Sequence, residues 1–146
     1  MSLLTAVFMT ALALLPVDPP QFWGQVDSAP AYEVLGGKAV VRLVSEGKAY
    51  MGIMEGKPGM RVPEHTHPTS IEMIYVLEGG GIMTVGGKRT VVRPGMAIQV
   101  PAGTKHSFEI PQDAKINFKG VQVYTPSGPE QRFKKGIRIN PKGATP

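Results

Sequence analysis

The stretch Gly59–Gly79, GMRVPEHTHPTSIEMIYVLEG, is the part of the chain that decides the fold. It contains three potential metal ligands, His65, His67 and Glu72, within eight consecutive residues. Side chains two residues apart on an extended strand point to the same side, so the two histidines present their imidazoles together. Glu72 follows Pro68 and heads an apolar run in which a strand is expected to begin. The stretch therefore predicts that two imidazoles and one carboxylate face the same metal ion.

The third and last histidine of the chain is His106. It ends a second segment that is punctuated by glycine and proline, including Pro94, Gly95, Pro101 and Gly103. All three histidines thus fall in two similar segments, and none is left for a separate role.

The length and composition favour one all-β domain. A chain of 146 residues is long enough for a single hydrophobic core. Its 18 glycines and 14 prolines separate short runs rich in Val, Ile, Tyr and Met, which is typical of a β-sandwich or barrel. We predict strands at 38–45, 49–54, 73–77, 82–85, 90–92, 97–100, 106–110 and 116–124, with a hairpin turn at 86–87.

The net charge of +5 is confined to the C-terminal end. Five basic residues and no acidic residue follow Gln131, so the preceding chain holds eleven basic and eleven acidic residues. Phe133 is the one aromatic residue among these charges, and stacking on bases would need several, so we predict a solvated basic tail and no nucleic-acid partner. The chain has no cysteine, which excludes disulfides and thiol chemistry. It also lacks a P-loop, a nucleophile elbow and a dinucleotide fingerprint.

The N-terminal region allows two interpretations. The apolar run 3–15 is too short to span a bilayer and resembles the core of a signal peptide, but no Lys or Arg precedes it. It is either a signal peptide of a periplasmic or secreted protein, or an uncleaved segment that packs on the barrel of a cytoplasmic one. The following residues, with Phe22, Trp23 and Tyr32, are interpreted as a wrapping arm. The predicted organisation is an N-terminal segment and arm at 1–36, a β-barrel at 37–126 and a basic tail at 127–146.

These two segments together resemble the motifs of the cupin superfamily, and the resemblance covers about the central two-thirds of the chain. The first motif has fixed positions that are filled by Gly59, His65, His67, Glu72 and Gly79. Fixed positions of the second are filled by Gly95, Pro101, Gly103 and His106, but its last position is Ile110 where the family has Asn. That Asn is not a metal ligand in the family, so the departure concerns a hydrogen bond rather than the metal site.

The resemblance implies a double-stranded β-helix, or jelly-roll barrel, with one divalent metal held by His65, His67, Glu72 and His106. Imidazole and carboxylate ligands suit Fe, Mn, Zn, Ni or Cu, and four protein ligands leave positions for water, substrate or dioxygen. With one carboxylate bound, the ion keeps a charge of about +1, so we expect an anionic or oxygen-chelating small molecule. An empty cupin shell is the alternative, but four unpaired polar groups in an apolar barrel are costly. The methionines are interpreted as core residues rather than copper ligands.

Alternation along the strands predicts which other side chains line the pocket. If Glu72 points inward, so do Ile74 and Val76, and Phe108 follows His106 in the same way. On the last strand one face carries Phe118, Gly120, Gln122 and Tyr124, and the opposite face carries residues 117, 119, 121 and 123. We therefore name Tyr124, Gln122, Phe108 and Phe118 as pocket candidates.

The predicted pocket contains no acid and base pair independent of the metal, because every histidine is a predicted ligand and Glu109 alternates away from His106. This disfavours the sugar-epimerase cupins, which use a histidine base without metal. It favours metal-centred chemistry of the dioxygenase, isomerase or decarboxylase type. A non-catalytic binding or sensor module with the same metal is the alternative, and a storage protein is a third. We also expect a homodimer, because jelly-roll sheets leave edge strands that need cover.

Overall fold

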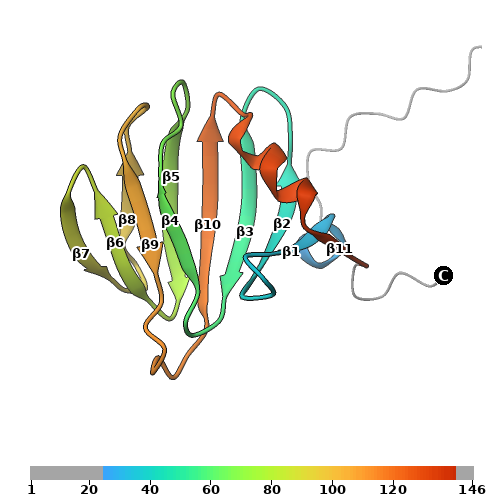
Figure 1. Cartoon of the computed structure of the whole chain (residues 1–146). Coiled ribbons are helices and arrows are strands. Elements are labelled where there is room, and N and C mark those ends of the chain that lie inside the picture. Colours follow the sequence, from blue (N-terminus) through green and yellow to red (C-terminus); the bar gives the residue numbers. More distant parts are fainter. Residues whose placement is uncertain (1–24, 141–146) are drawn as a thin grey trace, which may run out of the picture.

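Two antiparallel β-sheets face each other in the computed structural model, which describes residues 25–140 (Figure 1). The larger sheet has seven strands in the order β11-β1-β2-β3-β10-β5-β8, and the smaller has four in the order β4-β9-β6-β7. This arrangement confirms the predicted jelly-roll fold. The strands are β1 (Ala31–Val34), β2 (Ala39–Ser45), β3 (Tyr50–Gly56), β4 (Arg61–His65), β5 (Ile71–Glu78), β6 (Gly81–Val85), β7 (Lys88–Val92), β8 (Ala97–Val100), β9 (His106–Glu109), β10 (Phe118–Thr125) and β11 (Ile137–Ile139), and the two 3₁₀ helices are η1 (Val26–Ser28) and η2 (Pro129–Lys135).

The core lies between the two sheets and is built by alternation along the strands. On β10 every second residue from Phe118 to Tyr124 is buried, and the residues between them are only partly covered. This pattern confirms the predicted inward face of the last strand. Buried side chains that the strands contribute to this core include Val41, Leu43, Tyr50, Val76, Val100, Phe108, Phe118 and Tyr124.

Two turns depend on glycine. Gly86 and Gly87 both have positive φ, 54° and 80°, and connect β6 to β7 where Val85 pairs with Lys88. Two successive positive φ values define the tight hairpin turn that matches the twist of its strands, so the predicted hairpin is confirmed. Gly79, which ends the opening stretch, has φ 64°, and a Cβ there would lie 2.4 Å from the carbonyl oxygen of Asn117. Only glycine allows the chain entering β10 to pass so closely.

The larger sheet extends beyond the barrel boundaries expected from the sequence. β1 begins at Ala31 and pairs with both β2 and β11, so part of the predicted arm is a sheet strand. Residues 129–139 form η2 and β11 rather than the expected solvated tail. Figure 1 shows η2 crossing in front of β3 and β2 of the larger sheet toward β1 and β11.

Packing of a single aromatic side chain explains why this basic segment folds. Phe133 is buried, and its ring centroid lies 6.5 Å from that of Tyr50 on β3. Glu130 is buried as well, and one of its oxygens accepts the backbone N–H of Gly128 at 2.6 Å. The lysines of the segment face solvent, and Lys134 pairs with Glu46 at 2.7 Å. Lys134 and Lys135 thus stay hydrated, while Phe133 orders the backbone of the segment.

The predictions for the apolar run 3–15, for Phe22 and for Trp23 lie outside the described residues. Within residues 25–140, no helix has the length and apolar character needed to cross a membrane.

The outer face of the larger sheet exposes several large apolar side chains. Met73, Tyr75 and Leu77 on β5 and Met51 on β3 are each between 39% and 47% exposed. The register brings Met51 and Met73 to the same position of β10, opposite Val123. The homodimer expected from the sequence stays a prediction.

We expect Phe133→Ala to lower the free energy of unfolding by about 3 kcal/mol, because it removes a buried ring and leaves a cavity beside Tyr50. The measurement is equilibrium unfolding in urea. Ile137→Ala is the matched control in the same segment, since Ile137 is 70% exposed and its replacement should change stability by less than about 0.5 kcal/mol. Equal stability of Phe133→Ala and the parent protein would contradict the packing role of η2.

Candidate metal centre

The two histidine segments meet through strand pairing. β4 and β9 are antiparallel neighbours, and His65 is the direct partner of His106. The loop after β4 carries His67, whose carbonyl oxygen accepts the backbone N–H of Gly103 at 2.8 Å. The ring centroids of the three histidines lie 4.1 to 5.0 Å apart. Main-chain hydrogen bonds between the two segments therefore bring the three imidazoles together.

The opposite sheet supplies the carboxylate. Glu72 lies on β5 and pairs with Val100 on β8 and with Tyr124 on β10. Its Oε2 is 2.9 Å from Nε2 of His106 and 3.4 Å from Nε2 of His67. One potential ligand atom from each of the four predicted residues lies within 4.8 Å of all the others. Three of these side chains are buried, and His65 is partly exposed.

The hydrogen bonds of two histidines determine which ring nitrogen faces the centre. Nδ1 of His65 lies 2.8 Å from the carbonyl oxygen of Pro63, and Nδ1 of His106 lies 2.8 Å from that of Thr104. A carbonyl oxygen only accepts, so Nδ1 carries the proton in both rings and Nε2 of the neutral ring presents a lone pair. This second hydrogen bond is the usual way in which proteins orient metal-binding histidines.

Nε2 of His65, Nε2 of His106 and Oε2 of Glu72 are therefore acceptors that face one another, and Nε2 of His67 lies beside them. Nε2 of all three histidines and Oε2 of Glu72 are buried and have no hydrogen-bond partner in the described part of the chain. The 2.9 Å approach of His106 to Glu72 is an ion pair only if the imidazole is protonated. Leaving four such atoms without a donor is costly, and a cation between them removes the cost. The donor set of three imidazoles and one carboxylate fits a divalent transition metal.

The charges of the cluster are strongly coupled. Burial alone raises the pKa of Glu72, but the contacts with His106, His67 and Gln122 outweigh burial and hold that pKa well below its usual range. Burial lowers the pKa of His106, but the contact with Glu72 outweighs it and raises the pKa overall. The pKa of His65 is lowered, chiefly by burial. Glu72 is therefore an anion in the folded protein, and it attracts positive charge to the centre.

The second oxygen of Glu72 is held by two of the pocket candidates. Nε2 of Gln122 donates to Oε1 of Glu72 at 2.7 Å and to the hydroxyl of Tyr124 at 2.8 Å. The Tyr124 hydroxyl lies 3.4 Å from the same Oε1 and accepts a hydrogen bond from Nη2 of Arg132 at 3.1 Å. These contacts fix the carboxylate so that Oε2 is directed at the histidines.

The other two candidates form the apolar part of a small cavity beside the cluster. Phe108 and Phe118 pack with ring centroids 4.8 Å apart. The cavity has a volume of about 40 Å³ and is also lined by His65, Glu72 and His106. It has room for a water molecule or a small ligand group next to the cluster.

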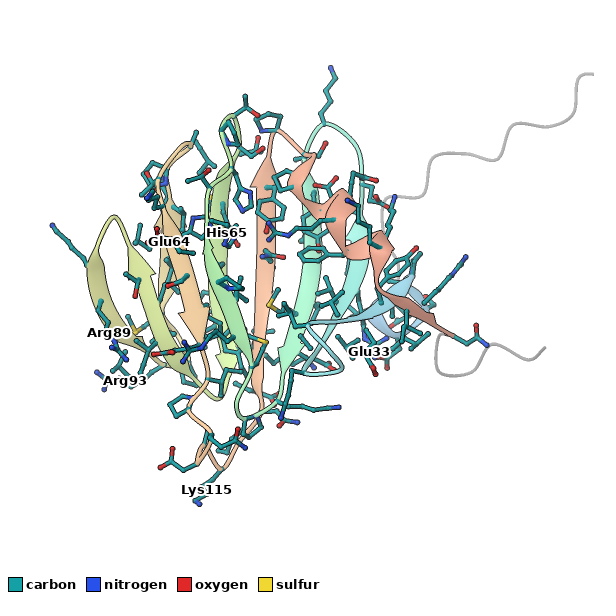
Figure 2. All side chains as sticks on the ribbon, viewed as in Figure 1. Glu33, Glu64, His65, Arg89, Arg93 and Lys115 are labelled. Carbon is teal, nitrogen blue, oxygen red and sulfur yellow. The ribbon has the colours of Figure 1, made fainter. Side chains whose placement is uncertain are left out.

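A larger outer cavity of about 460 Å³ opens next to the inner one. Residues that line both cavities mark the connection between them: Met54, Val62, His65 and Arg132. Figure 2 labels His65 on β4 together with its exposed neighbour Glu64, which pairs with Lys105 rather than with the cluster. His65 is thus the member of the cluster that faces the opening.

Arg132 is the site residue that the sequence analysis missed, because the run of basic residues was assigned to a solvated tail. Phe133 beside it was the available signal, since an aromatic residue in a charged segment often anchors that segment on a core.

Ile110, which stands where the second motif has Asn, contributes to the packing of the barrel. Ile110 is buried, its N–H donates to the carbonyl of Met60 at 2.9 Å, and its own carbonyl accepts the N–H of Gly59 at 3.1 Å. The main chain thus ties the end of the β9 segment to the turn that precedes β4, and the side chain is part of the core.

Comparison with known proteins gives similarities over part of the chain. A polyketide synthase protein, CurC of Streptomyces cyaneus, is 32% identical over 65 residues, which are 44% of this chain and 42% of that protein. Quercetin 2,3-dioxygenase of Bacillus subtilis is 30% identical over 90 residues, which are 58% of this chain and 27% of that protein. The matches span less than half the length of these two relatives.

Solved structures share the fold at low sequence identity. The polyketide cyclase RemF of Streptomyces resistomycificus has a TM-score of 0.64 and 22% identity, with 75% of this chain and 82% of that chain covered. A predicted oxalate decarboxylase of Thermotoga maritima has a TM-score of 0.64 and 19% identity, with 70% and 97% covered. The family model described as "Cupin domain" matches residues 52–124, half of the chain. With this match and the jelly-roll fold, the chain belongs to the cupin family.

Proposed function

We propose that this chain binds one divalent transition-metal ion through His65, His67, Glu72 and His106 and acts as a small metalloenzyme on an oxygen-chelating or anionic small molecule. The observation that carries the proposal is the set of four buried ligand atoms that have no hydrogen-bond partner in the described residues and lie within 4.8 Å of one another. Fe, Mn, Zn, Ni and Cu all suit these ligands.

The polar side chains around the cluster define what the protein itself contributes. A bound divalent metal supplies Lewis-acid chemistry and, if it is redox-active, electron transfer to dioxygen. Gln122 and Tyr124 hold Glu72 in place through its Oε1. Burial and the charge of Glu72 raise the pKa of Tyr124, so its hydroxyl keeps its proton and serves as a hydrogen-bond partner rather than as a base.

The inner cavity offers little else for proton transfer. Apart from the cluster itself, the polar side chains that line it in the described residues are Ser107, Gln122 and Arg132. None of these is a ready general base near neutral pH. This supports reactions that depend on the metal, namely dioxygenation, isomerisation or decarboxylation.

The names of relatives support the same broad class. Two of them are a dioxygenase acting on quercetin and a protein of a polyketide synthase, and a structural neighbour is a polyketide cyclase. Quercetin carries adjacent oxygen atoms that can chelate a metal, which is the kind of ligand proposed for this chain.

Replacing His65 and His67 together by Ala should reduce bound metal from about one ion per chain to a trace, because two of four ligands are lost. Elemental analysis of the purified protein is the measurement. Glu64→Ala is the matched control on the same strand, since Glu64 is exposed and pairs with Lys105, and its metal content should not change. Unchanged metal in the double variant, with the fold intact by circular dichroism, would refute the site.

Gln122→Met should weaken metal binding by about 10- to 100-fold, because Glu72 loses the donor that orients its carboxylate while the volume of the side chain is nearly kept. Competition with a chelator of known affinity measures the change. Gln99→Met, on the exposed side of β8, is the control and should bind metal like the parent. A parent-like affinity of Gln122→Met would show that this hydrogen bond does not support the ligand.

Catalysis itself is tested by turnover. The chain is loaded separately with Fe²⁺, Mn²⁺, Ni²⁺, Cu²⁺ and Zn²⁺ and assayed for dioxygen uptake and for products with flavonols, hydroxy acids and dicarboxylates. We expect at least one metal form to convert one of these substrates and the His65/His67 double variant to lose that activity. If every form binds these ligands and none turns over, the protein is a binding module rather than an enzyme.

A further inference from the structure

The segment after the barrel places one cation at the boundary between the two cavities. Arg132 belongs to η2, is half-buried, and lines both the inner and the outer cavity. Phe133 anchors the helix in the core. The guanidinium carbon lies 5.0 Å from the centre of the Phe133 ring, and Nη2 donates to the Tyr124 hydroxyl at 3.1 Å. The side chain is therefore positioned by two contacts rather than free in solvent.

The charge of Arg132 is not neutralised by a carboxylate. No acidic group lies within ion-pair distance of it among residues 25–140, whereas its neighbour Lys134 pairs with Glu46 at 2.7 Å. Arg61 and Arg89 both pair with Glu109. In Figure 2 the labelled Arg89, Arg93 and Lys115 lie well away from His65, at the other end of the barrel. Within the described part of the chain, Arg132 is thus a cation without a direct ion-pair partner, and it lines the site.

With the metal of the proposed function in place, the region would carry excess positive charge. The divalent ion and Glu72 sum to about +1, and Arg132 brings the total to about +2 in a partly desolvated cavity. Lys135, which is exposed, adds a further cation at the rim of the outer cavity. Such a field attracts a ligand that carries a negatively charged group.

The guanidinium has donors left for that anion. It carries five N–H groups, and the Tyr124 hydroxyl takes one of them. A carboxylate or phenolate oxygen can accept the others in the planar geometry that Arg provides and Lys does not. The remaining wall of the outer cavity is apolar, with Val34, Leu35, Met54, Val62, Pro63 and Phe133. This wall suits a hydrocarbon or aromatic body rather than an inorganic ion.

We propose that Arg132 forms a recognition subsite for an organic anion with an apolar body, whose carboxylate or phenolate oxygen binds the guanidinium while the body occupies the outer cavity. This proposal rests on the proposed function, because the metal supplies part of the positive charge. In this proposal Arg132 determines which ligand binds and takes no part in a chemical step.

The test is isothermal titration calorimetry of the full chain loaded with Zn²⁺, with salicylate as the anionic probe and salicylamide as its neutral counterpart. Arg132→Gln should weaken salicylate binding by about 10- to 100-fold and change salicylamide binding by less than about twofold, because only the charged hydrogen bonds are lost. Arg132→Lys should bind salicylate with intermediate affinity, since it keeps the charge and loses the planar fork.

Arg138→Gln is the matched control. It removes the same charge from β11, where Arg138 is exposed and lines neither cavity. We expect parent-like binding of both probes. An equal loss in Arg132→Gln and Arg138→Gln, or no loss in either, would overturn the proposal. If thermal unfolding shows that Arg132→Gln does not fold, the affinities of the two probes for the parent protein are compared instead. Salicylate binding no tighter than salicylamide binding would then refute the subsite.

Metal content measured in every sample separates this proposal from the proposed function. Normal metal content with salicylate affinity independent of Arg132 would refute the subsite and leave the metal site standing. Absence of bound metal, with salicylate affinity still dependent on Arg132, would refute the metal site and support the subsite.

Discussion

Four potential ligand atoms converge in the buried centre of this barrel, and the surrounding contacts hold them there. Nε2 of three histidines and Oε2 of Glu72 lie within 4.8 Å of one another without a donor between them. Lone pairs at this distance repel one another unless a positive charge separates them. The carbonyls of Pro63 and Thr104 prevent two of the rings from relieving the repulsion by turning the protonated nitrogen inward. The backbone around the cluster therefore orients these two rings in the way that metal-binding histidines are oriented.

Support for the cluster extends outward in one continuous set of contacts. Glu72 is held by Gln122, Gln122 by its bond to Tyr124, and Tyr124 also accepts a hydrogen bond from Arg132. The ring of Tyr124 stacks on Tyr50 with centroids 5.4 Å apart, and Tyr50 packs on Phe133. The C-terminal helix thus completes the barrel core and positions a guanidinium at the opening in the same turn. The proposed role of Arg132 in selecting the ligand therefore depends on the packing of η2.

Much of this site could be predicted because it follows from short-range rules. Alternation along β10 assigned Gln122 and Tyr124 to the inner face, and burial of every second residue there agrees with it. His65 and His67 lie two residues apart, and spacing alone suggested a shared centre. The motif resemblance connected them to His106 across the chain. Arg132 could not be found in this way, because neither a period nor a motif spacing links it to the cluster.

The sequence by itself determined the fold class, the four candidate ligands and the inward face of the last strand. The inward face follows from local alternation, and the complete ligand set and the jelly-roll fold follow from the motif resemblance, and both can be read from residue order. Only the tertiary structure decided that residues 129–139 form η2 and β11 against the barrel and that Arg132 lies between the two cavities. That outcome depends on the packing of Phe133 against Tyr50, which lies 83 positions earlier. Packing between residues so far apart leaves no periodic signal in the sequence.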